Sequence, residues 1–508
     1  MKWNDWPKGF LLLVCTCSFF LSSVAGMMKV YDITYYGAIG DGLTDNTRSI
    51  QDAIDACSKT GGEVYVPAGV FLTSTLMLKS NVTLNITGGA TILAQKSIEK
   101  YPEMEAGFRF YGDQWAKYSL IFCKGMQNVA IKGEGVIDGQ GASFPASDNE
   151  MERYSRRPFL LWFIDCRNIS VSNIELRNSA FWMQYYLLCE NVYISGLRIW
   201  NHSNKNNDML DIDGCKNVVI SDITGDSDDD GITIKSTSPA ISENIVISNC
   251  IISSHCNAIK FGTESTGGFR RVIISNCIIK PSKQRTVIYG KPDGISGIAL
   301  EVVDGGVMED INIHNIVMEG PQVPIFARLG NRARKYIAEA GTPPVGKMKN
   351  VTISNVFATG ADATGCSLTG IEKMPIENVT IRDVSIEVNG SNLPDSLYDV
   401  RNKDTDYPEA TMFGILPSYG FYISYATGLT ILDITTRYKG MEGRPGVIIA
   451  NTVGFMADGL NIQSSGNTKV QVYILNSRNG SLKDFRSAYS PGKLFFKDKY
   501  SRNIRFIR

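Results

Sequence analysis

Histidine is scarce in this chain of 508 residues, which contains only His202, His255 and His314. No two cysteines have the C-x-x-C spacing that is common in zinc-binding segments. Because zinc sites in proteins draw mainly on cysteine and histidine, the composition argues against a zinc site, and we expect neither a metal nor a cofactor. Net charge is also lacking, since 51 basic residues balance 51 acidic ones. A chain that binds nucleic acid through its overall charge would be basic, so we expect no nucleic-acid partner.

Long apolar runs are absent after Gly26. The segment from Phe10 to Val24 is almost free of charge, follows two lysines, and ends in the small-x-small sequence Ser23-Val24-Ala25. This pattern is typical of a secretory signal peptide, so we expect residues 1–26 to be removed and the mature chain to be secreted or periplasmic. The alternative is an N-terminal membrane anchor, although the run is short for one. We expect no membrane span in the mature chain.

The cysteines do not point to a disulfide framework, and the chain has no obvious linker. Nine of the eleven cysteines follow Ala25, and an odd number in an exported chain does not suggest complete pairing. No stretch is rich in proline or serine in the way that separates domains. We therefore expect a single domain from residue 27 to residue 508.

A short phrase recurs along the chain: Asn, a β-branched residue, any residue, Ile or Val, a small polar residue, any residue, and Ile or Leu. Copies start at nearly regular intervals, at Asn168, Asn191, Asn217, Asn244 and Arg271. The next two copies, at Asp310 and Asn350, follow after clearly longer steps, which indicates a loop inserted into each of those coils. The alternation of apolar and polar residues has a period of two, so each phrase predicts a strand with one buried face. Short strands at a fixed period predict an all-β solenoid whose coils stack on one another.

The cysteines follow the same repeat. Cys166, Cys189 and Cys215 each stand just before the Asn of their phrase, whereas Cys250 and Cys277 share a later position in theirs. Equivalent positions stack in a solenoid, so we expect interior columns of small apolar side chains. Redox or metal chemistry is the alternative.

A helix is expected at the start of the solenoid. The sequence Asp45-Asn46-Thr47 precedes an apolar stripe at helical spacing, and Gly61-Gly62 follows it. The stripe consists of Ile50, Ala53, Ile54 and Cys57. A helix over the open end of the first β coil would protect its exposed edge.

Acidic residues are densest in two successive coils, at 206–213 and 226–235. Asp208 and Asp229 are separated by just under one coil, so we expect Asp208 to lie beside Asp229 and Asp230 on the adjacent rung. Clustered carboxylates repel one another, which keeps one of them protonated at higher pH. A protonated and an ionised carboxyl side by side are the groups that glycosidic hydrolysis requires. Two other interpretations stay open, namely turn-capping by aspartate and calcium binding.

Residues 158–265 resemble glycoside hydrolase family 28, the polygalacturonase family. The order and spacing of several short blocks carry the resemblance: Asn178-Ser179-Ala180-Phe181-Trp182, Cys189-Glu190-Asn191-Val192, Asn207-Asp208, Asp229-Asp230-Gly231-Ile232 and Ile234-Lys235-Ser236. Residues 40–47 and 61–67 resemble the start of many pectin-acting β-helix proteins. The resemblance covers roughly residues 29–330. It implies a single-stranded right-handed parallel β-helix of the pectin-lyase type.

The family also implies hydrolysis with inversion by three aspartates. Asp208 matches the aspartate of the family's Asn-Thr-Asp motif, with Asn206 as its asparagine, and Asp229 and Asp230 match the double aspartate. The family assigns the acid role to the first of the pair, here Asp229. Asp208 and Asp230 would then hold and activate the water.

Two family motifs differ in this chain. The Gly-His-Gly motif aligns with Cys256-Asn257-Ala258, so Asn257 stands where the family has histidine. The Arg-Ile-Lys motif aligns with Ala299-Leu300-Glu301, which removes both cations that grip the uronate. An acid in place of the lysine would repel a substrate carboxylate, so rhamnogalacturonan and decorated oligomers are candidate substrates beside polygalacturonan.

Other cations are candidates to bind the substrate, together with Asn206 and Asn257. Lys235 and Lys260 are separated by about one coil, and we expect both on the face that carries the aspartates. Arg328 and Arg332 lie in the second long insertion, and an inserted loop is a natural wall for a cleft. The alternative is that these are solvated surface charges, above all the nearby Arg334.

Three aromatic residues close to the acidic coils are ambiguous. Trp182, Tyr185 and Tyr186 would either stack on sugar rings or pack within the fold.

Three functions follow from these patterns. The leading hypothesis is a glycoside hydrolase that acts on an acidic plant cell-wall polysaccharide or oligosaccharide containing galacturonate. The second is a polysaccharide lyase on the same fold, in which the aspartates would hold calcium. The third is a β-helix that binds glycans without catalysis.

Overall fold

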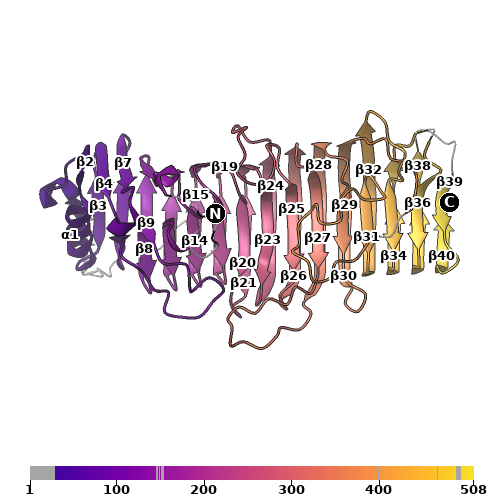
Figure 1. Ribbon diagram of the computed structural model, residues 1–508, viewed down its shortest axis with the longest axis horizontal. Helices are drawn as coiled ribbons and strands as arrows, with labels where there is room; N and C mark the ends of the chain where they lie inside the picture. The colour runs from indigo at the N-terminus through magenta and orange to yellow at the C-terminus, as the bar shows by residue number, and fades with distance from the viewer. Residues whose placement is uncertain are drawn as a thin grey trace, which may run out of the picture.

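The computed structural model describes residues 29–144, 147, 149, 154–397, 400–465, 467–487 and 493–507. The predicted signal peptide, residues 1–26, lies outside these residues. The described chain winds into one long right-handed parallel β-helix, with its first coils at one end and its last coils at the other (Figure 1). The predicted all-β solenoid is therefore confirmed.

One face of the solenoid is a sheet of 14 strands that stack in chain order, each parallel to the next. This sheet carries the site described below. Its strands are β5 (Leu76–Met77), β8 (Ser119–Lys124), β11 (Phe159–Ile164), β14 (Gln184–Leu187), β17 (Leu210–Asp213), β20 (Ile232–Ser236), β23 (Asn257–Ser265), β25 (Ser296–Val302), β27 (Val323–Leu329), β29 (Cys366–Thr369), β31 (Phe421–Ser424), β33 (Val447–Ala450), β36 (Val470–Leu475) and β39 (Lys493–Lys497).

The second sheet has 26 strands and forms the rest of the wall. In the middle of the chain β24 pairs with both β21 and β22, so one long strand continues across faces that two strands occupy in the coil before. The strands of this 26-stranded sheet are β1 (Val30–Asp32), β2 (Asp41–Asp45), β3 (Gly62–Val66), β4 (Gly69–Thr73), β6 (Val82–Ile86), β7 (Ala90–Ala94), β9 (Gln127–Gly133), β10 (Val136–Asp138), β12 (Arg167–Ser172), β13 (Glu175–Arg177), β15 (Glu190–Ser195), β16 (Arg198–Asn201), β18 (Lys216–Ser221), β19 (Thr224–Ser227), β21 (Ser242–Ser248), β22 (Ile251–Ser254), β24 (Gly268–Ile279), β26 (Val307–Glu319), β28 (Lys347–Ala361), β30 (Ile376–Asn389), β32 (Ala426–Lys439), β34 (Val453–Asp458), β35 (Asn461–Ile462), β37 (Arg478–Lys483), β38 (Arg486–Ser487) and β40 (Arg502–Ile507).

The recurring asparagine has a conformational and a hydrogen-bonding reason. Asn168, Asn191 and Asn217 have φ of 56°, 58° and 57°, a left-handed conformation that asparagine tolerates better than most residues. Each side chain donates to the one on the coil before it, with Asn191 Nδ2 at 3.0 Å from Asn168 Oδ1 and Asn217 Nδ2 at 3.1 Å from Asn191 Oδ1. The ladder therefore fixes both the turn and the register of successive coils.

The core fills the tube between the sheets. In the repeat, Ile169 pairs with Val192 and Val192 with Val218, so apolar side chains stack in columns inside the coils. Full burial of each such side chain stabilises the fold by about 1.5–3 kcal/mol relative to exposure. The described cysteines are all unpaired and buried, and Cys123 and Cys166 lie with their sulfurs 3.6 Å apart. The predicted interior columns are confirmed.

The helix α1 (Thr47–Ser58) lies at the end of the molecule where the chain enters the solenoid (Figure 1). Its buried residues are Ile50, Ala53, Ile54 and Cys57, and it contacts β1, β3, β5 and β6. Three short 3-10 helices complete the helical content that has defined bounds, at Ile33–Tyr36, Ile98–Lys100 and Gly141–Ser143. In the part of the chain that the structure describes, no helix is both long and apolar enough to cross a membrane.

Candidate functional site

Two neighbouring rungs of the 14-stranded sheet bring the predicted aspartates together, and a third, β23, supplies Asn257 and Lys260. β17 pairs with β20 through Leu210 and Ile232, and just before these two residues, at matching positions, stand Asp208 and Asp230. The Met209 amide donates to the Asp230 carbonyl at 2.9 Å, which continues this register beyond the strands. Asp208 therefore stands level with Asp230 of the following coil. The prediction that Asp208 lies on the rung beside the double aspartate is confirmed.

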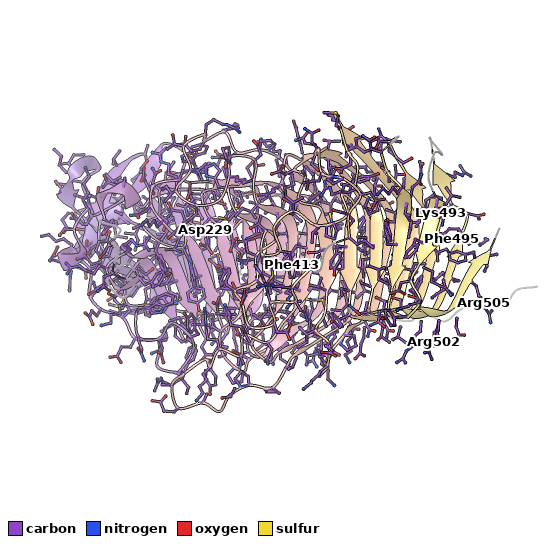
Figure 2. The ribbon with its side chains drawn as sticks, turned by 45° about the vertical axis from the view of Figure 1, so that its right-hand side comes forward. Asp229, Phe413, Lys493, Phe495, Arg502 and Arg505 are labelled. Carbon is purple, nitrogen blue, oxygen red and sulfur yellow. The ribbon has the colours of Figure 1, made fainter. Side chains whose placement is uncertain are left out.

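These carboxyls line a cleft of about 300 Å³ on the side of the solenoid. Figure 2 shows Asp229 on this flank, far from the C-terminal coils that carry Lys493 and Phe495. The cleft residues come from the three central rungs and from loops near residues 111, 154, 334 and 407. They are Tyr111, Trp115, Tyr154, Trp182, Asn206, Asp208, Asp229, Asp230, Lys235, Cys256, Asn257, Lys260, Thr263, Glu264, Arg334, Tyr407 and Glu409.

Two asparagines hold the backbone at Asp208. Asn201 Nδ2 donates to the Asp208 carbonyl at 2.9 Å. Asn207 is buried, and its Nδ2 donates to the carbonyls of Ser179 and Phe181 at 2.9 and 3.1 Å. The side-chain amides of Asn201 and Asn207 are thus occupied by backbone carbonyls. The Asp208 carboxyl faces the cleft.

Burial and mutual repulsion raise the pKa of two of the aspartates. The pKa of Asp229 rises from 3.8 to about 7, because burial and then the charge of Asp230 disfavour its ionised form, while Lys260 and Lys235 oppose the rise. The pKa of Asp208 is raised well above its ordinary value, first by burial and then by Asp211 and Asp229. A cleft that holds a protonated carboxyl near neutral pH has the acid that proton donation requires.

Asp230 has a different environment, because two donors are directed at its carboxylate. Lys260 Nζ lies 2.9 Å from Oδ2, and Asn257 Nδ2 donates to Oδ1 at 2.8 Å. Ser296 in turn donates to Asn257 Oδ1 at 2.6 Å, which fixes the orientation of the amide. Lys260 and Asn257 thus line the cleft as predicted, but both hold Asp230.

Lys235 occupies the centre of a second charge cluster. Its Nζ lies 3.5 Å from Asp211, 3.8 Å from Glu264 and 3.9 Å from Asp208, and 4.6 Å from the centre of the Trp182 ring. Neighbouring carboxylates, Asp211 foremost, outweigh burial and raise the pKa of Lys235, so it stays charged. A fixed ammonium among the acids takes the place that a calcium ion would fill, which argues against the calcium interpretation of this cleft.

Asn206 also lines the cleft. Its Oδ1 accepts a hydrogen bond from Arg157 at 3.0 Å, and its φ is 54°. Trp182 lines the cleft as well, whereas Tyr185 and Tyr186 are buried, and Tyr185 donates to Asp213 at 2.8 Å. Of the three ambiguous aromatics, only Trp182 is placed to stack on a ligand.

The prediction that Arg328 and Arg332 bind the substrate needs correction. Arg328 is buried and is not among the residues that line the cleft; it donates to the Gly370 carbonyl at 3.0 Å and to Asn402 Oδ1 at 3.0 Å. Arg332 pairs with Asp304, with Nε 3.0 Å from Oδ1. Both side chains therefore bind other parts of the chain. Arg328, on β27, holds the long loop that contains Asn402, and Arg332 holds Asp304.

Arg334, which we expected to be a solvated charge, lines the cleft instead. Its guanidinium lies 2.8 Å from Glu264 and 4.5 Å from the centre of the Tyr111 ring. Tyr111, Trp115, Tyr407 and Glu409 also belong to the cleft without any sequence signal. They lie on loops far from the aspartates in sequence, and only the folded chain brings them there.

Glu301, which replaces the family's lysine, lies just outside the cleft. It is fully buried, and neither carboxyl oxygen has a hydrogen-bond partner among the described residues. Burial raises its pKa well above the ordinary value, although the charge of Lys260 opposes the rise. Burial thus favours the neutral form of Glu301, which weakens the repulsion that its sequence position suggested.

Comparisons with known proteins show the family and the fold. A model described as glycosyl hydrolases family 28 matches residues 57–405. A probable polygalacturonase of Vitis vinifera is 35% identical over 212 residues, which are 40% of this chain and 43% of that protein. An exo-poly-alpha-D-galacturonosidase of Dickeya chrysanthemi is 30% identical over 258 residues, 42% of each chain. The chain therefore spans less than half the length of each of these relatives.

A solved structure has the same fold over nearly its whole length. The hyperthermoactive exopolygalacturonase of Thermotoga maritima superimposes with a TM-score of 0.62 at 23% identity, covering 82% of this chain and 94% of that one. The likeness includes the parallel β-helix and its right-handed winding. Since the family model covers well over half of the sequence, this chain belongs to glycosyl hydrolase family 28.

Proposed function

We propose that the protein hydrolyses glycosidic bonds in galacturonate-containing chains of the pectic type. The observation that carries the proposal is the convergence of Asp208, Asp229 and Asp230 on one cleft, with the pKa of Asp229 raised to about 7. Family membership and the names of the similar proteins, a polygalacturonase and a galacturonosidase, support the same chemistry.

Asp229 is the proposed general acid. Near neutral pH about half of its population is protonated, and a protonated carboxyl can deliver its proton to the oxygen of the departing sugar. Asp229 is also only partly buried, whereas Asp208 and Asp230 are almost fully buried. The most accessible of the three carboxyls is therefore the one that meets the glycosidic oxygen.

Asp230 is the proposed base. Donors from Lys260 and Asn257 match an ionised carboxylate, which is the form that accepts a proton from water. Asp208, on the adjacent rung, helps to position the water in this scheme, and burial and the neighbouring carboxylates raise its pKa well above the ordinary value. Water on the opposite side of the sugar from Asp229 would give inversion at the anomeric carbon.

The charges in the cleft bear on the substrate. Each of the three cations that line it already has a carboxylate close by: Lys235 with Glu264 at 3.8 Å, Lys260 with Asp230 at 2.9 Å, and Arg334 with Glu264 at 2.8 Å. No cation of the described lining is left for the substrate alone. A rhamnogalacturonan or a decorated oligomer therefore fits this cleft at least as well as unmodified polygalacturonan, because it brings fewer adjacent carboxylates.

The test is product analysis on a panel of polygalacturonan, methyl-esterified pectin and rhamnogalacturonan. Hydrolysis yields new reducing ends without ultraviolet absorbance, whereas a lyase yields unsaturated products that absorb. The Asp229→Asn variant serves as the control for contaminating activity. Unsaturated products, or equal product from parent and variant, would reject the proposal.

The compartment is part of the proposal. The sequence of residues 1–26 supports export, so we infer that the protein acts outside the cytoplasm, on extracellular or periplasmic pectic material. Fractionation of cells that express the full chain tests this. An unprocessed chain that remains in the cytoplasm would contradict it.

A further inference from the structure

Two of the three histidines meet Asp228, the residue that precedes the cleft residue Asp229. His202, Asp228 and His255 each directly follow a strand of the 26-stranded sheet, β16, β19 and β22. Asn201 pairs with Ser227 and Ser227 with Ser254, so the next residues stand at equal positions on three successive coils. One ligand atom from each of the three lies within 4.8 Å of the others. All three side chains are at most 1% exposed.

The Nε2 nitrogen of each histidine ring lies at hydrogen-bond distance from an acceptor oxygen. His255 Nε2 lies 2.8 Å from the Gln284 carbonyl oxygen, and His202 Nε2 lies 2.9 Å from Asp226 Oδ1. A carbonyl oxygen accepts only, and a carboxylate does the same, so both Nε2 atoms carry the proton. In the neutral rings the lone pairs are then on Nδ1. Histidines that bind metals are typically oriented in this way, with the outer N–H donated to a carboxylate or a backbone carbonyl.

Both Nδ1 atoms face the same oxygen. His255 Nδ1 lies 2.8 Å from Asp228 Oδ1, and His202 Nδ1 lies 3.9 Å from it. Lone pairs that face a carboxylate oxygen need a cation between them. A proton on His255 Nδ1 fits its hydrogen-bond distance of 2.8 Å from Asp228, but 3.9 Å is too long for a proton on His202 Nδ1 to make such a bond. His202 Nδ1 is buried with no hydrogen-bond partner in the described chain. A metal ion would satisfy all three donors.

We propose that His202, Asp228 and His255 bind a divalent ion of the zinc type. Tetrahedral zinc with nitrogen and oxygen ligands at about 2.0–2.1 Å places its ligands about 3.4 Å apart. The two separations above, 2.8 and 3.9 Å, lie on either side of that value. Two imidazoles and one carboxylate suit zinc or cobalt better than calcium, which prefers oxygen ligands.

The ion would support the catalytic turn. Asp228 immediately precedes Asp229, and the amides of Ile288 and Tyr289 donate to the two Asp228 oxygens at 2.9 Å each. A metal there would tie three coils and the loop at residue 288 to one point. It would therefore stabilise the fold whether or not the cleft hydrolyses pectin, and the metal test stands apart from the activity test.

Zinc chloride, titrated calorimetrically into untagged, chelator-treated protein, tests the site. We expect one zinc per chain with a dissociation constant below about 1 µM, and a higher melting temperature when zinc is present. Cobalt in place of zinc should give the visible absorption of a tetrahedral site. Failure to bind zinc at millimolar concentration would overturn the proposal without any variant.

Three glutamine substitutions locate the ion. In His202→Gln and His255→Gln the amide can still donate to Asp226 or Gln284, but the Nδ1 ligand is lost, so zinc should bind at least about 100-fold more weakly. His314→Gln removes the third histidine, on the distant strand β26, and should bind zinc like the parent. Unchanged binding in both of the first two variants, or loss in the third, would refute the site; circular dichroism checks that each is folded.

Discussion

Replacing Asp229 by asparagine separates the proposed general acid from every structural role of that side chain. The amide has nearly the same size and can still accept the hydrogen bond that the Asp230 amide donates to Oδ1 at 3.0 Å. What it lacks is a proton that can move to the glycosidic oxygen. Because general acid catalysis contributes about 10²–10⁴-fold, we expect kcat to fall by that factor while KM stays within about threefold.

The same substitution has a second effect with a defined sign. In the folded protein the pKa of Asp229 is about 7, above the ordinary 3.8, so folding disfavours the ionised form. The resulting loss of stability is absent below pH 3.8, grows between the two values, and is complete above about pH 7. The pKa difference corresponds to ~4 kcal/mol, which solvent screening at this partly exposed carboxyl reduces to ~1–2 kcal/mol. Asparagine avoids this loss.

The variant should therefore be less active and, at alkaline pH, more stable. We expect its melting temperature to exceed that of the parent by about 1–3 °C at about pH 8.5 and to match it at about pH 4. Asp165→Asn is the control, because it removes one carboxylate from an exposed left-handed turn, where φ is 49°. The reasoning is refuted if kcat stays within tenfold of the parent, or if the stability change is the same at both pH values.

Three further outcomes follow from the contacts in the cleft. The value of kcat/KM on a neutral substrate should fall as pH rises through about 7, since Asp229 must be protonated; a flat profile far into the alkaline range would contradict this. Lys260→Met leaves the Asp230 carboxylate buried without its ammonium, so urea unfolding should show that the free energy of unfolding falls by about 3–5 kcal/mol. Activity assays should show a raised KM for acidic oligomers. The control Lys59→Met, at an exposed lysine, should change neither value. Arg328→Gln removes donors to Gly370 and Asn402, so limited proteolysis should cut near residue 402 faster than in the parent, and equal rates would show that Arg328 does not anchor this loop.

The fold was predictable because one short phrase specifies it repeatedly. Each copy supplies a few buried side chains and one asparagine that adopts the left-handed turn, and Asn191 shows both features at once through its φ of 58° and its bond to Asn168. A register set by many identical turns does not depend on any distant contact. The loops have no such repeat, so their course over the 14-stranded sheet was not predictable from the sequence.

In the site, too, the residues on strands were predictable and the residues on loops were not. Asp208, Asp229, Asp230, Lys235 and Lys260 lie on strands or directly beside them, and counting coils placed them correctly on one face. Arg328, Arg332 and Arg334 follow one another closely in sequence, yet only the last lines the cleft. Which arginine points outward depends on where strand β27 ends and the loop begins. The alternation of apolar and polar residues does not predict that position.

Counting histidines by local spacing could not point to the proposed zinc site, for a related reason. Zinc motifs place their ligands a few residues apart, and this chain has no cysteine or histidine pair with such a motif's spacing. In a solenoid, however, the relevant spacing is one coil: Asp228 follows His202 by one coil and precedes His255 by one more, the same step that separates copies of the repeat. Residues that are remote by a local motif are neighbours by this measure. Ligand searches in β-helices should therefore use the coil length, and titration of this chain with zinc decides whether that rule holds here.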